Sequence, residues 1–136
     1  MEEEKKEKTE NPEQEVKLTA EEAVRRISCG KLLLSVPITD GDKQYEFLEY
    51  DFNALTGWEL AKALDGGGSN AVRTNSISDV QSLSLFAAAA AKRTGGLDAT
   101  DIRTRLSAVD AIAAINVASL FFRGSLLAAN SRITSV

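Results

Sequence analysis

Histidine is absent from this chain of 136 residues, and cysteine occurs once, at Cys29. Histidine-based catalytic triads, zinc sites built on histidine or several cysteines, and disulfides within the chain all need residues that the sequence lacks. A single cysteine between Ser28 and Gly30 is typical of a small packing residue in a reducing compartment. These absences exclude much of common enzymology, and we expect no catalytic residue, no cofactor and no metal site.

Long apolar runs and clusters of positive charge are also scarce. The two longest uncharged runs, residues 80–91 and 111–122, contain twelve residues each, fewer than the roughly 18 to 20 that span a bilayer. The N-terminus has no apolar stretch of the secretory kind, and the basic residues form scattered pairs rather than a stripe. The sequence predicts a cytoplasmic protein that binds neither membranes nor nucleic acids.

The negative charge is concentrated at the N-terminus. Residues 1–15 contain seven glutamates and three lysines, which accounts for the net charge of −4 of the whole chain. Because almost no apolar residue occurs there, residues 1–16 are predicted to be a disordered charged arm. The body that follows has equal numbers of acidic and basic residues, which favours self-association because net charge does not keep the copies apart.

The apolar pattern predicts a β-hairpin near the N-terminus. A capping-box pattern from Thr19 to Glu22 first predicts a short helix that stops near Gly30. Apolar residues then alternate along residues 32–38, the Asp-Gly pair at 40–41 favours a turn, and residues 43–52 provide a second strand. A two-stranded hairpin is marginal by itself, so it must pack on helices or on another chain.

Three to four α-helices are expected after the hairpin. Capping residues and glycine stops place them at about residues 56–66, 80–94, 101–106 and 107–123, with Thr56 and Glu59 opening the first and Thr100 or Asp101 opening the third. The fold class is therefore α+β, with residues 17–124 as one small helical domain carrying the hairpin. Residues 125–136 are expected to form a C-terminal tail that frays.

Two patterns that could carry chemistry are better explained as structure. The glycines at 66–68 follow a helix and lack the lysine of a phosphate-binding loop, so a linker is predicted. Asp98, Asp101 and Asp110 do not match an EF-hand loop, and helix capping is favoured for Asp101. Asp110 is expected to face the dipole of its helix or to pair with an arginine. An enzyme built on these three carboxylates is the least favoured hypothesis.

The two longest predicted helices are apolar on more than one face, which is more surface than a hairpin and a short helix can cover. Contacts with a partner or with other copies are therefore expected. Phe121 and Phe122 are consecutive and cannot both point into one core, so one of them is predicted to contact a neighbouring chain or the C-terminal tail. The residues expected to make partner contacts are Leu83, Phe86, Ile112, Leu120 and Phe122, with core packing as the alternative for each.

The order of the segments carries further information. The first half contains Leu-Ser-Val-Pro-Ile at residues 34–38, the Asp-Gly-Asp turn, and Tyr-Asp-Phe-Asn-Ala-Leu-Thr-Gly-Trp-Glu-Leu at residues 50–60. The second half has an alanine-rich segment, Thr-Gly-Gly-Leu at residues 94–97, a short helix and a final apolar helix entered by Asp110. Over residues 31–123 this order resembles the phage tail assembly chaperones of long-tailed phages.

The resemblance implies a non-enzymatic assembly factor of phage or prophage origin that acts in the host cytoplasm. It further implies that the protein binds the long helical tape measure protein, keeps it soluble, and recruits tail tube subunits during virion morphogenesis. A homo-oligomer is also expected from the neutral body. The alternative hypothesis is a structural tail or head-tail connector subunit whose hairpin edges pair with neighbours to form an oligomeric ring.

Overall fold

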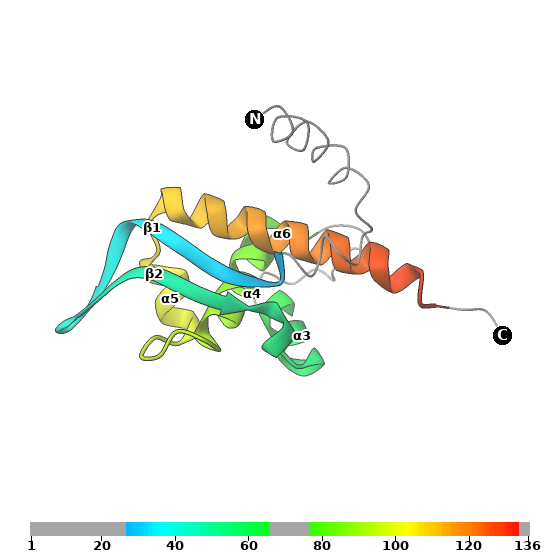
Figure 1. The fold of residues 1–136 in the computed structure, drawn as a ribbon, viewed down its shortest axis with the longest axis horizontal. Helices are drawn as coiled ribbons and strands as arrows, with labels where there is room; N and C mark the ends of the chain where they lie inside the picture. Colours follow the sequence, from blue (N-terminus) through cyan, green and yellow to red (C-terminus); the bar gives the residue numbers. More distant parts are fainter. Residues whose placement is uncertain (1–26, 66–76, 134–136) are drawn as a thin grey trace, which may run out of the picture.

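The computed structural model describes residues 27–65 and 77–133. Within these residues an antiparallel hairpin precedes four α-helices (Figure 1). The elements are β1 (Cys29–Asp40), β2 (Lys43–Asp51), the 3-10 helix η1 (Phe52–Ala54), α3 (Gly57–Asp65), α4 (Asp79–Ala91), α5 (Ala99–Arg105) and α6 (Ala108–Asn130). The predicted α+β class is confirmed. The predicted charged arm, the predicted helix from Thr19 and the glycines at 66–68 lie outside the described residues.

The hairpin turns where the Asp-Gly pair predicts. Gly41 has φ of 63°, a left-handed conformation that glycine adopts without a steric cost. The register of the two strands shifts between Leu33 and Ile38, where residues 34–37 of β1 face only Glu46 of β2. The extra residues form a bulge that includes Pro37, which has no N–H to donate to a partner strand.

Three helices begin with a capping box, a reciprocal pair of side-chain to backbone hydrogen bonds. The pairs are Thr56 with Glu59 before α3, Ser78 with Gln81 before α4, and Asp98 with Asp101 before α5. Each box satisfies donors that the first turn of a helix leaves free. The start of α5 was predicted too late, because Asp98 rather than Thr100 or Asp101 is the N-cap.

The last helix is longer than predicted. The sequence predicts an end near Gly124 and a fraying tail, whereas α6 continues to Asn130. A glycine inside a helix costs only about 1 kcal/mol relative to alanine, and leucines and alanines dominate the six residues that follow it. Because Ala128 is buried, packing helps to hold this extension. The predicted helix end near Gly124 and the predicted fraying over residues 125–130 are therefore wrong.

The core lies where α4 meets the hairpin and α6. α4 contacts α3, α5, α6 and β2, and α6 runs alongside β1 (Figure 1). Aromatic side chains join these layers. The Tyr50 ring lies with its centroid 5.2 Å from that of Phe86, and Phe121 of α6 stacks on Phe52 of η1 at 4.4 Å. The alanines of α4 allow its neighbours to approach closely, so the hairpin gains the support that two strands need.

Candidate functional site

A buried carboxylate fixes the start of α6 against the bulge of β1. Asp110 is only 3% exposed. Its Oδ1 accepts a hydrogen bond from the Ser35 amide at 2.8 Å, and its Oδ2 accepts one from the Val36 amide at 3.1 Å. The Ser107 hydroxyl donates a third hydrogen bond at 3.0 Å. Burial raises the pKa of Asp110, but these hydrogen bonds outweigh burial and hold the pKa below its ordinary value.

The sequence predicted two roles for Asp110. Its place in the first turn of α6 is as predicted and suits the positive end of the helix dipole. The predicted ion pair with an arginine is replaced, among the described residues, by the two strand amides. Asp110 therefore joins two segments about 75 residues apart and holds the N-terminal end of α6 against β1.

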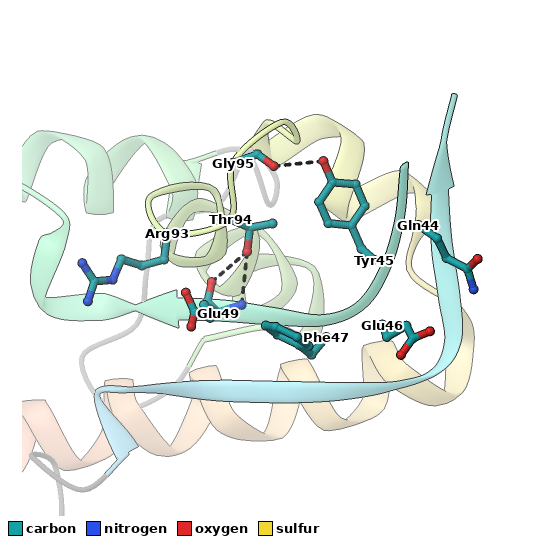
Figure 2. A pocket seen from close by; sticks show the side chains of 8 residues that line it. All are labelled: Gln44, Tyr45, Glu46, Phe47, Glu49, Arg93, Thr94 and Gly95. Atoms are coloured by element: carbon teal, nitrogen blue, oxygen red, sulfur yellow. Dashed lines mark hydrogen bonds between the residues drawn. The ribbon is translucent and has the colours of Figure 1, made fainter. Parts of the chain in front are cut away.

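A threonine plays the corresponding part at the other strand. Thr94 Oγ1 accepts a hydrogen bond from the Glu49 amide at 3.1 Å and donates one to the Glu49 carbonyl at 3.0 Å (Figure 2). Beside it, the Tyr45 hydroxyl donates to the Gly95 carbonyl at 2.9 Å. These bonds lock the turn after α4 onto β2, because both main-chain groups of Glu49 are satisfied there.

An open pocket of about 250 Å³ lies along this contact. Its lining includes Glu46, Phe47 and Arg93. Figure 2 shows Glu46 and Arg93 at opposite ends of the pocket, so they do not face one another as an acid and base pair would. Several polar groups between them are used by the bonds of Tyr45 and Thr94. The pocket therefore follows the contact between the hairpin and the α4–α5 turn.

The most conspicuous surface is one side of α6, which we call the exposed α6 face. It consists of Val109, Ile112, Asn116, Leu120, Arg123, Leu127 and Asn130. Spacings of three and four residues place all seven on the same side of the helix, away from the buried Ala114 and Ala118. Ile112 is 69% exposed and Leu127 is 59% exposed. With a rise of 1.5 Å per residue, the face extends for about 30 Å.

The length of α6 changes the membrane argument made from the sequence. Within the described part of the chain, α6 is the one helix long and apolar enough to cross a membrane, with hydropathy of 1.6 and 17% of that stretch buried. The length and composition of α6 fit a helix that another protein covers as well as they fit a membrane-spanning helix. The bonds of Asp110 and the packing on α4 and β1 tie α6 to the rest of the domain.

The structure separates the five predicted contact residues into three groups. Ile112 and Leu120 lie on the exposed α6 face. Leu83 and Phe122 are partly buried and pack against the core. Phe86 is fully buried, so its assignment to a partner contact is corrected to core packing, because the hairpin covers the middle of α4.

For the consecutive phenylalanines the premise that both cannot pack against the core is wrong, whereas the contact of one of them with a neighbouring chain or the C-terminal tail stays a prediction. Both Phe121 and Phe122 pack against the core with part of each side chain exposed. A core on one side of α6 would take up only one of the two rings, whereas η1 provides a second contact through Phe52. The side of α6 that faces the solvent is instead the one that begins at Val109, and neither phenylalanine belongs to it.

Two exposed apolar groups were not predicted from the sequence. Leu127 lies seven residues after Leu120, a spacing that places both on one side of a helix, but the signal counts only when the helix passes Gly124. On the outer side of the hairpin, Leu33 and Phe47 are cross-strand neighbours, and Leu33 is 74% exposed. Alternation along β1 was used to find its inner side, so the outer leucine was not considered.

The described residues hold no group of three or more histidine, cysteine, aspartate or glutamate side chains arranged to bind a metal ion. Asp98 and Asp101 form the capping box of α5, in which Asp101 is the third helical residue and Asp98 is the N-cap. No protein-family model matches the chain, and neither a curated protein nor a solved structure matches it. The candidate site therefore rests on the exposed α6 face.

Proposed function

We propose that this protein is a phage tail assembly chaperone, a non-enzymatic protein of the host cytoplasm that binds the tape measure protein and recruits tail tube subunits to it. The exposed α6 face carries the proposal. Apolar residues at spacings of three, seven and eight along one side of a helix suit the docking of a second, amphipathic helix. A long helical protein with apolar faces is a partner of this kind.

The size of the face suits a contact that forms and is later released. Fully burying a leucine, isoleucine or valine side chain contributes roughly 1.5–3 kcal/mol. The four apolar side chains of the face are already partly covered, so docking gains about 1 kcal/mol from each. Because association itself costs several kcal/mol, one face supports modest affinity, and several copies along one long partner would be needed for stable coverage.

The element order supports the same proposal. An alanine-rich α4, a glycine turn, the short α5 and a final helix entered by Asp110 follow the hairpin, which is the order on which the resemblance depends. The alternative of a ring subunit requires free main-chain groups along the hairpin. Those of Ser35, Val36 and Glu49 are already hydrogen-bonded to Asp110 and Thr94, which favours the chaperone.

Co-expression with the long, helix-rich protein encoded just downstream tests the proposal. The full chain should co-purify with that protein and increase its soluble fraction. Ile112→Asp should reduce the recovered partner at least tenfold, because a charge is placed where the partner helix packs. Leu33→Asp is the matched control, since Leu33 is equally exposed but lies on the hairpin, and it should leave recovery unchanged.

Four results would contradict the proposal. The downstream protein could fail to co-purify, or Ile112→Asp could bind it as well as the unchanged chain does. The chain could form a discrete ring by itself and ignore the downstream protein, which would support the structural subunit. Sedimentation with anionic lipid vesicles, abolished by Ile112→Asp, would assign the face to a membrane instead.

A further inference from the structure

The exposed α6 face matches itself when it is reversed. Counted from the point between Ser119 and Leu120, Ile112 and Leu127 lie at equal distances on opposite sides, about 11 Å along the helix axis. Asn116 and Arg123 also lie at equal distances, about 5 Å from that point. The sequence of the face from Ile112 to Leu127 is thus apolar, polar, apolar, polar, apolar in either direction.

We propose that the free protein forms a homodimer in which two α6 helices pack antiparallel through this face. Ile112 of each copy then contacts Leu127 of the other, and the two copies of Leu120 meet at the two-fold axis. An interface of this kind is isologous, because the same patch is used by both copies. We further infer that the second copy covers the face until a partner helix replaces it, and this step rests on the proposed function.

The polar members of the face are also matched in this arrangement. Asn116 lies opposite Arg123 of the second copy, where its side-chain oxygen can accept a hydrogen bond from the guanidinium. Arg123 is exposed and has no ion pair among the described residues, so it is free for this contact. The two copies of Arg123 lie about 10 Å apart along the helix axis. Salt screens the repulsion between their positive charges at that distance.

A parallel pair does not have this property. In a parallel arrangement in register, Arg123 would face Arg123 and Asn116 would face Asn116, so two positive charges would meet. The antiparallel arrangement avoids this charge repulsion. It also keeps three apolar contacts, two between Ile112 and Leu127 and one between the two copies of Leu120. At the ends Val109 meets Asn130 of the second copy, where the asparagine remains at the solvent-exposed end of the helix.

The extent of the face sets the expected strength. A single pair of helices buries less than the roughly 800 Å² per partner of a standard stable interface, so the dimer should dissociate on dilution. Sedimentation equilibrium of the full chain without any partner should show the mass rising from 14.6 kDa toward twice that value over roughly micromolar to millimolar concentrations. A monomer at all of these concentrations overturns the proposal.

Charge pairs establish the direction of the helices. Ile112→Glu and Leu127→Lys should each weaken the homodimer at least tenfold, because a charge is placed against an apolar side chain. Mixing the two variants should restore a heterodimer, since the introduced carboxylate and the introduced ammonium group face one another only in the antiparallel arrangement. Both positions are well exposed, so the fold should tolerate the changes, and Leu33→Lys should leave the dimer unaffected.

The remaining outcomes separate this inference from the proposed function. Restoration by a mixture of Ile112→Glu with Ile112→Lys, and not with Leu127→Lys, would overturn the antiparallel arrangement in favour of a parallel one. A monomeric free chain that still captures the downstream protein would leave the proposed function standing and refute the dimer. A dimer that forms as described but captures no downstream protein would support the interface and contradict the chaperone.

Discussion

Replacement of Asp110 tests how α6 is held in place. Asp110→Ala removes the acceptor of hydrogen bonds from the Ser35 and Val36 amides and from the Ser107 hydroxyl. Each lies between 2.8 and 3.1 Å, and the carboxylate is almost fully buried. The amides are left without a protein acceptor, so the expected loss is a desolvation cost as well as a loss of bonding.

The size of the effect follows from these three bonds. Hydrogen bonds to a charged group contribute about 1.5–3 kcal/mol each. The cost of burying the carboxylate offsets part of that gain, so we expect Asp110→Ala to lower the free energy of unfolding by about 2–4 kcal/mol. Asp98→Ala is the matched control: Asp98 caps the exposed start of α5, and its loss should cost about 1 kcal/mol.

The loss should also depend on pH. In the folded chain the pKa of Asp110 lies below its ordinary value, whereas an unfolded aspartate has a pKa of about 3.9. The unfolded chain therefore takes up the proton first as the pH falls, and folding loses stability in that range. The contribution is complete above about pH 5 and disappears as the pH falls through the folded pKa, so wild type and Asp110→Ala should converge in acid.

Urea unfolding between about pH 3 and pH 7, followed by circular dichroism, measures both effects. Asp110→Asn should behave like Asp110→Ala. The asparagine NH₂ group would face a hydrogen-bond donor at a position where the carboxylate oxygen accepts a hydrogen bond. The reasoning is refuted if Asp110→Ala costs no more than Asp98→Ala, or if the difference from wild type stays constant down to the acid end of that range.

Three further substitutions test other contacts by urea unfolding. Thr94→Val should lower the free energy of unfolding by about 1–3 kcal/mol, because both main-chain groups of Glu49 lose their partner; an unchanged midpoint would contradict this. Gly96→Ala should destabilise the fold by about 1–3 kcal/mol. Gly96 has φ of 96°, and a Cβ there would overlap the Tyr45 hydroxyl. A stabilised variant would contradict this conformation of the turn. Phe86→Ala should cost about 3–5 kcal/mol, a loss that an exposed contact residue would not show.

Local signals in the sequence were sufficient for most elements. The Asp-Gly pair located the hairpin turn, and the capping patterns located the starts of α3 and α4, because each of these features depends on interactions between residues at most four apart. These parts of the fold needed no knowledge of what packs against them. Alternation along β1 was less successful: Ile38 is buried as expected, but Val36 is 54% exposed, because the bulge at residues 34–37 interrupts the alternation.

The tertiary structure decided which surfaces remain exposed. Phe86 and Ile112 both lie in apolar helices, yet Phe86 is fully buried and Ile112 is largely exposed, because the hairpin and α6 cover α4 while nothing in the described residues covers the outer side of α6. The partners of Asp110 lie on a strand about 75 residues away, and helical periodicity contains no information about such a distance. The sequence alone thus determined the elements and the abundance of apolar surface, and the packing of distant segments determined where that surface lies.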